Sequence, residues 1–169
     1  KMKRIIFDTS VYGKLIEDDL IRDKFENKFE SDEYVVYGNS IIRKELRSTS
    51  KTIIFRDKKL RLLLLALYDS FVKKKNHDLK INPLIEKLSK DYFEQYKSQR
   101  GSFSKEEMKN DLIIIATATI YQLDVIISND ERTMLSPICL TVYKTVNKSY
   151  GLKDPVFKLY STFKKELLW

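Results

Sequence analysis

The chain has 169 residues and a hydrophobic content of 43%, enough for one domain with a proper core, and its length argues against two full domains. Its 32 lysines and arginines outnumber 24 acids, and the resulting charge of +8 either favours a polyanionic partner such as nucleic acid or serves solubility alone. The single cysteine, Cys139, excludes an internal disulfide, and no apolar run reaches the roughly 18 residues of a membrane span, so we expect a cytoplasmic protein.

The first part of the sequence alternates short apolar runs with amphipathic stretches. RIIFD at 4–8 predicts a strand that ends in a carboxylate, and the stretch after it has the period of a helix. EYVVYGNS at 33–40 repeats this order, with Asn39 or Ser40 as the N-cap of a helix through IIRKELRS.

Three further helices are indicated in the middle of the chain. Apolar residues recur at helical spacing in 60–71 and again in 84–96, where Pro83 suits the first turn. Ser104 and Glu107 have the spacing of a capping box, which predicts a helix that begins there and runs through KNDLIIIATATIYQ.

The last part of the sequence predicts two strands and a terminal helix. VIIS at 125–128 predicts one strand and the apolar run 138–143 another, while Asp154 followed by Pro155 has the form of an N-cap and first helical residue. Short apolar strands separated by helices are typical of a parallel sheet covered on both faces. We therefore expect one α/β domain over 2–169, a three-layer α/β/α sandwich, with an extension from about residue 144.

Carboxylates stand where ligands bind in such a fold, beyond the carboxyl ends of the strands. Asp8 ends the first strand and Asp130 follows VIIS, while Glu45 and Asp111 lie in the helices that begin near residues 40 and 104. Two like charges about 4 Å apart repel by roughly 4 kcal/mol at an effective dielectric near 20. A cluster of such acids needs a proton or a bound cation, and an oxygen-only site suits Mg²⁺ or Mn²⁺.

Four segments together resemble the PIN domain family, whose members are mostly metal-dependent ribonucleases and include the VapC-like toxins of toxin–antitoxin pairs. IIFDTSVY at 5–12 resembles the opening strand of the family, and SIIRKELR at 40–47 its second acidic motif, with Glu45 in the acidic place. NDLIIIATA at 110–118 is similar to the Asp-x-x-Ile-Ala-x-Ala helix, and IISND at 126–130 to the Thr/Ser-x-Asp strand end.

This resemblance implies a PIN-like fold and hydrolysis of RNA phosphodiester bonds by one or two divalent cations, Mg²⁺ or Mn²⁺, that activate a water. It assigns Ser10 and Ser128 the orientation of carboxylates or waters. The residues that it assigns to metal binding and catalysis are Asp8, Glu45, Asp111 and Asp130.

Two other functions stay open. An Asp at the end of a first strand also occurs in phosphoryl-transfer enzymes of the haloacid-dehalogenase type, but those need a second Asp where this chain has Ser10. The fold can also serve as a non-catalytic RNA-binding or scaffold module, against which four intact acids argue.

The basic residues beside the acidic motifs are candidates for phosphate contacts, with a solvated surface as the alternative. They include Arg43, Arg47, Lys109 and Arg132, together with Lys14, Lys44, Arg100 and Lys105. In the helix at 60–71, Leu62 and Leu65 fall off the main apolar stripe. A second apolar face there predicts a homodimer or an antitoxin contact, unless the helix is enclosed by its own domain.

Overall fold

The computed structural model describes residues 2–169 and contains a central sheet of four parallel strands. The strands lie in the order β2-β1-β5-β6, so the first strand of the sequence occupies an inner position. Phe7 pairs with Ile127 across β1 and β5. The bounds are β1 Lys3–Phe7, β2 Tyr34–Tyr37, β5 Val125–Ser128 and β6 Val156–Leu159.

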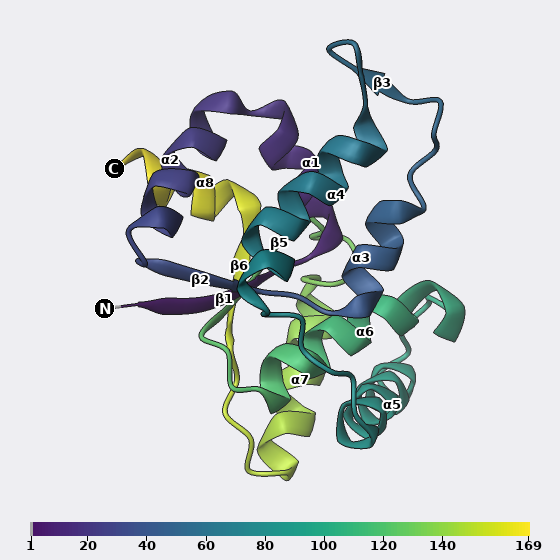
Figure 1. The fold of residues 1–169 in the computed structure, drawn as a ribbon. Helices are drawn as coiled ribbons and strands as arrows, with labels where there is room; N and C mark the ends of the chain where they lie inside the picture. The colour runs from purple at the N-terminus through teal and green to yellow at the C-terminus, as the bar shows by residue number, and fades with distance from the viewer. Residues whose placement is uncertain (1) are drawn as a thin grey trace.

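Helices cover both faces of the sheet, which confirms the predicted three-layer α/β fold (Figure 1). One layer holds α1 Thr9–Glu17, α2 Asp19–Glu30, α4 Leu60–Phe71 and α8 Tyr160–Leu168. The other holds α5 Pro83–Ser98, α6 Lys105–Ile120 and α7 Pro137–Ser149. The short α3, Ser40–Arg47, follows β2, and β3 Ile54–Phe55 pairs with β4 Lys58–Lys59 in a protruding hairpin. Within residues 2–169, none of these helices has the length and apolar character to cross a membrane.

The helix starts read from the sequence are present with their capping bonds. The Asn39 side chain accepts a hydrogen bond from the Ile42 amide (3.0 Å) and so begins α3. Ser104 and Glu107 form the reciprocal bonds of a capping box at the start of α6. From Leu112 to Thr119 every residue of α6 is buried, because this helix lies between the sheet and α5.

An aromatic cluster fills the layer on the α2 side of the sheet. The Phe7 ring lies 5.2 Å from that of Phe25 and 5.7 Å from that of Phe163, both in edge-on geometry. Such contacts add about 0.5–1.5 kcal/mol each beyond the area they bury. Because Phe7 is the residue before Asp8, this packing fixes the end of β1 from which the first acid projects.

Two predictions for the C-terminal part were wrong. The run 138–143 is not a strand but lies in α7, where Ser136 caps the helix and Pro137 takes its first position. The pair Asp154 and Pro155 does not begin a helix, because the next residues form β6, the edge strand beside β5. β5 takes 156–159 as its partner, whereas 138–143 packs as a helix against α5.

Gly38, directly after β2, packs against Tyr68. A Cβ at Gly38 would clash with the Tyr68 hydroxyl, which donates to the Asn39 carbonyl (3.1 Å) and the Asp78 carboxylate (2.6 Å). Gly38→Ala is therefore expected to lower the free energy of unfolding by about 1–3 kcal/mol, because the ring must move.

The matched control for this substitution is Gly13→Ala in α1, where an added Cβ would meet nothing within 4 Å. Alanine there is expected to raise the free energy of unfolding by about 1 kcal/mol, because glycine is a poor helix former. Chemical denaturation measures both changes. A Gly38→Ala protein as stable as the wild type would contradict the close packing described for Tyr68.

Candidate active site

Asp8 is the most buried of the four predicted acids, with 5% of its surface exposed. It occupies the N-cap position of α1, yet its side chain makes no capping bond to that helix. Instead, Oδ2 of Asp8 accepts hydrogen bonds from the Ser10 hydroxyl (2.8 Å) and the Ser128 hydroxyl (2.7 Å). The carboxylate is thus oriented by one serine from its own helix and one from the neighbouring strand.

The end of β5 brings Asp130 to the same edge of the sheet. Its backbone amide donates to the Ser128 hydroxyl (2.9 Å), and the Asn129 amide donates to the Ser10 hydroxyl (3.0 Å). The Asp130 carboxylate accepts bonds from the backbone amides of Arg132 (3.1 Å) and Thr133 (3.0 Å) and from the Thr133 hydroxyl. Asp130 therefore caps the turn that follows β5 as well as facing the other acids.

Glu45 and Asp111 come from α3 and α6, and one buried side chain ties these helices together. The side-chain oxygen of Asn39 caps α3, and the side-chain nitrogen of the same residue donates to the Thr117 hydroxyl of α6 (3.1 Å). Oε1 of Glu45 accepts a hydrogen bond from the Thr9 hydroxyl (2.6 Å), and Oε2 accepts one from the Asn110 amide (3.3 Å). Glu45 is thereby held between the start of α1 and the residue next to Asp111.

The electrostatics show that the other three carboxylates act on Asp111 and that Glu45 also acts on Asp8. Burial, followed by the charges of Asp8, Asp130 and Glu45, raises the pKa of Asp111 to about 8. Burial also raises the pKa of Asp8, against the opposing hydrogen bonds from Ser128 and Ser10. Burial by itself would raise the pKa of Asp130. Hydrogen bonds from Thr133 and from the backbone amides of the turn nevertheless hold this pKa below its usual value. In the absence of a cation, Asp111 is thus mainly protonated at neutral pH.

The donor chemistry of this cluster fits a hard divalent cation. All four candidate ligands are carboxylates, and Ser10 and Ser128 supply the supporting hydroxyls that orient such ligands. In the described residues, 2–169, no group of three or more His, Cys, Asp and Glu side chains is already gathered tightly enough to form a metal site. Glu45 and Asp130 are instead engaged by hydrogen bonds from threonine and asparagine, as given above.

The predicted phosphate-binding residues fall into different surroundings. Arg43 forms a two-pronged ion pair with Asp69 (2.9 Å for both contacts), so its charge is largely compensated. Arg47 and Lys109 are exposed and belong to α3 and α6, the helices that carry Glu45 and Asp111. Arg132 is exposed in the turn that Asp130 caps.

Reasoning from the sequence missed three polar residues of the site. Thr9 and Asn110 both bind Glu45, and the Thr133 hydroxyl binds Asp130 and acts on Asp111. Thr9 and Asn110 each stand next to a predicted acid in the chain, which was the available signal. Thr133 carried no such signal, because its position depends on the course of the turn after Asp130.

Comparison with known proteins agrees with this architecture. A chain of the VapBC2 structure from Rickettsia felis, solved with a DNA fragment from its promoter, superposes with a TM-score of 0.59 at 13% identity. The alignment covers 93% of this chain and 98% of that one, which shows a common fold. No curated protein sequence matches significantly.

The sequence profile of the PIN domain matches residues 5–136, a stretch that contains all four carboxylates and ends before α7. This match spans well over half of the chain. The chain therefore belongs to the PIN domain family.

Proposed function

We propose that this protein is a metal-dependent endoribonuclease that hydrolyses RNA phosphodiester bonds at Asp8, Glu45, Asp111 and Asp130. The observation that supports it most is the convergence of four carboxylates on one edge of the sheet, with two serines directed at the buried Asp8. Membership of a family of nucleases points the same way. Mg²⁺ or Mn²⁺ would be held by these carboxylates.

Such an ion lowers the pKa of water toward neutrality and offsets the negative charge that develops on the phosphate. The residues of the chain have separate tasks around it. Asp8 presents one oriented carboxylate, because Ser10 and Ser128 occupy the same oxygen and leave the other unbonded by them. Asp111 holds a proton in the metal-free site and releases it when a cation takes over the compensation of charge.

The experiment that tests the proposal is cleavage of labelled single-stranded RNA by the wild-type protein with Mg²⁺, with Mn²⁺ and with chelator. Cleavage that requires either metal supports the proposal. A protein that cleaves no RNA with either metal, yet still binds it, is a non-catalytic RNA-binding module instead.

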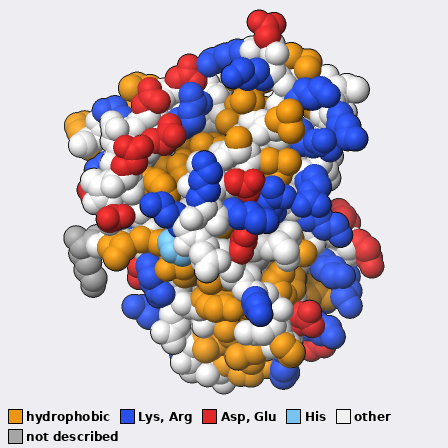
Figure 2. All heavy atoms as spheres, viewed as in Figure 1, with side chains coloured by type: hydrophobic (Ala, Val, Ile, Leu, Met, Phe, Trp, Pro, Cys, Tyr) orange, Lys and Arg blue, Asp and Glu red, His pale blue; other side chains and the backbone are white. Residues whose placement is uncertain are grey.

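We further infer that the chain is the toxin of a toxin–antitoxin pair and that a helix of the antitoxin lies between α2 and α4. A cavity of about 430 Å³ opens there, with an apolar floor that includes Ile16 and Leu67. Its charged lining residues include Lys58, Glu26 and Arg56, and Arg56 pairs with Asp19 (2.7 Å). Figure 2 shows hydrophobic side chains exposed in this region. On α4, Leu62 is 55% exposed, whereas Leu65 packs on the core of its own chain. The apolar face of an amphipathic helix fits such a surface.

The substitution Ala66→Glu places a charge in this cavity at an exposed position, and Leu84→Glu on α5 is the control. Ala66→Glu is expected to weaken binding of the antitoxin by at least about 10-fold, as desolvating a carboxylate is costly. Titration calorimetry measures the affinity. If light scattering shows that the wild type alone is a dimer and Ala66→Glu a monomer, the cavity serves a homodimer and the antitoxin assignment is wrong.

A further inference from the structure

Two cavities join into one groove around the start of α3. The first, about 730 Å³, lies between α3 and the linker that follows α4, and the second, about 540 Å³, lies between α3, α5 and α6. Ser40 and Ile81 line both, so the two hollows adjoin each other. We call this surface, lined by residues of both cavities, the basic groove.

The walls of the basic groove carry an excess of positive charge. Eight lysines and arginines line it against two acids, Asp78 and Glu86. Arg43 alone among the eight takes part in an ion pair within residues 2–169, so seven positive charges are free to meet a ligand. Figure 2 shows Lys and Arg side chains gathered over α3 and toward α5 and α6.

The linker that forms the outer wall is fixed in place. The Leu79 amide donates to the Gly38 carbonyl (2.7 Å), and the Tyr121 hydroxyl donates to the Lys80 carbonyl (2.9 Å). The Tyr68 hydroxyl donates to the carboxylate of Asp78, the residue before Leu79 (2.6 Å). The linker thus runs beside the end of β2 as an ordered segment, and the groove exists before any ligand arrives.

The second half of the basic groove leads to the acidic cluster. Asn110 lines the groove, and its amide donates to the Glu45 carboxylate (3.3 Å). Ile41, another lining residue, lies one helical turn before Glu45 on α3. A chain that follows the groove past Ser40 and Ile41 therefore arrives at the proposed catalytic carboxylates.

The floor of the basic groove is apolar, which bears on the kind of nucleic acid that fits. Ile41, Leu79, Ile81 and Ile113 line it between the lysines. Unpaired bases bury against apolar side chains while their phosphates contact cations, whereas a duplex presents only its backbone to such a surface. The path also bends around the end of a helix, which suits a flexible single strand.

We propose that the basic groove binds a segment of single-stranded RNA next to the scissile phosphate, with Lys73 and Lys80 at its far end and Lys105 and Lys109 near the carboxylates. This deepens the proposed ribonuclease function and rests on it. It implies that the preferred substrate has an unpaired stretch long enough to span the groove, and that a very short oligonucleotide uses the carboxylates alone.

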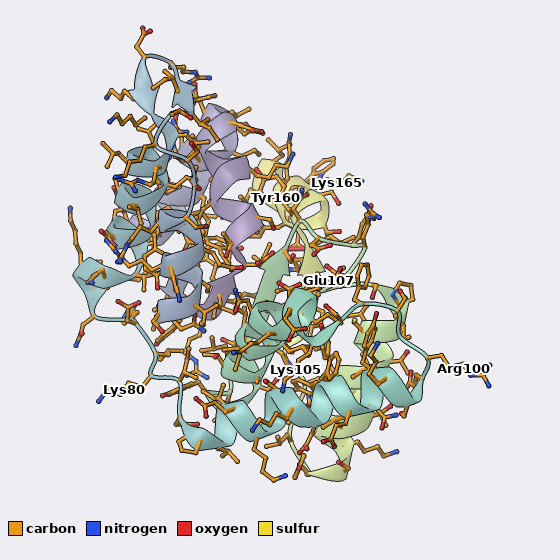
Figure 3. The ribbon with its side chains drawn as sticks, turned by 90° about the vertical axis from the view of Figure 1, so that its right-hand side faces the viewer. Lys80, Arg100, Lys105, Glu107, Tyr160 and Lys165 are labelled. Atoms are coloured by element: carbon orange, nitrogen blue, oxygen red, sulfur yellow. The ribbon has the colours of Figure 1, made fainter. Side chains whose placement is uncertain are left out.

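The test compares two double substitutions with the same change of charge. Lys73→Glu with Lys80→Glu alters the far end of the groove, and Lys153→Glu with Lys165→Glu alters exposed lysines elsewhere. Figure 3 shows Lys80 and Lys105 in the half of the molecule that holds α5, and Lys165 in the opposite half. Fluorescence anisotropy measures the binding of a long single-stranded RNA and of a duplex, with chelator present to prevent cleavage. Cleavage of that RNA and of a trinucleotide is then measured with Mn²⁺.

The groove variant is expected to bind the long single strand at least about 10-fold more weakly than the control variant at low salt, with a shallower dependence on salt concentration. The control variant should cleave both the long RNA and the trinucleotide as the wild type does. Equal binding by the two variants, or duplex bound as tightly as single strand by the wild type, would overturn the groove assignment. A wild type that cleaves nothing would refute the proposed function while leaving the binding comparison intact.

Discussion

Metal-free protein carrying Asp111→Asn is expected to be more stable than the wild type at pH 8, by about 2–4 kcal/mol in the free energy of unfolding. The folded wild type keeps a proton on Asp111 up to a pKa of about 8, whereas the unfolded chain releases it near 3.8. Stability is therefore lost as the pH rises between these values, and the loss is complete above pH 8. Each pKa unit corresponds to 1.36 kcal/mol, which gives an upper limit near 6 kcal/mol before partial exposure reduces it.

Asparagine removes this titration, so the advantage of Asp111→Asn should shrink as the pH falls from 8 to 5. Urea denaturation in the presence of chelator at several pH values measures the difference in free energy of unfolding between the two proteins. Glu106→Gln, an exposed acid in the first turn of α6, is the control and should give no such gain. Mn²⁺ should stabilise the wild type more than Asp111→Asn. An Asp111→Asn protein less stable than the wild type at pH 8 would show that the carboxylates do not repel one another as described.

The largest effect on activity is expected from Asp8→Asn. An asparagine oxygen can still accept the hydrogen bonds from Ser10 and Ser128, so the fold should be kept while one negative charge is lost. Metal affinity and the rate of RNA cleavage should each fall by at least about 10-fold, because even changes to residues that only orient ligands reach that size. Cleavage rates at several Mn²⁺ concentrations separate weaker metal binding from a slower reaction.

Asp124→Asn is the matched control for this substitution. Asp124 lies at the opposite end of β5, where its carboxylate accepts the Arg4 backbone amide (2.8 Å), a bond that asparagine can also make. Full activity is expected for Asp124→Asn. If Asp8→Asn cleaves as fast as Asp124→Asn, the cleavage comes from a contaminant or from another site.

The comparison of α5 and α7 shows how far the sequence alone reaches. Both helices begin with a polar cap followed by proline, Asn82 with Pro83 and Ser136 with Pro137. The first was recognised because apolar residues follow at helical spacing, whereas the run after Pro137 is rich in residues that favour strands. Its helix is decided by packing against α5, a contact that local propensity does not contain.

The placement of the four acids near one edge of the sheet was predictable, whereas their hydrogen-bond partners were predictable only in part. Strand ends and helix starts indicated where the carboxylates lie, since parallel strands place their carboxyl ends at one edge. The role of Asn39 in joining α3 to α6 was not predicted, although its capping role was, because the bond to Thr117 depends on the packing of two distant helices. Such bonds follow from the tertiary structure, whose details no single segment encodes.

The pairing of β1 with β5 has a consequence for the order of folding. Ser128 and Asp8 are 120 residues apart in the sequence, and Asn110 and Glu45 are 65 apart. Contacts this distant require closure of long loops and form late in comparison with individual helices. A chain with only its local helices formed holds the four carboxylates apart and has no affinity for a shared cation. The repulsion among them arises only as the sheet closes, so this acidic edge opposes the last steps of its own assembly until a cation binds.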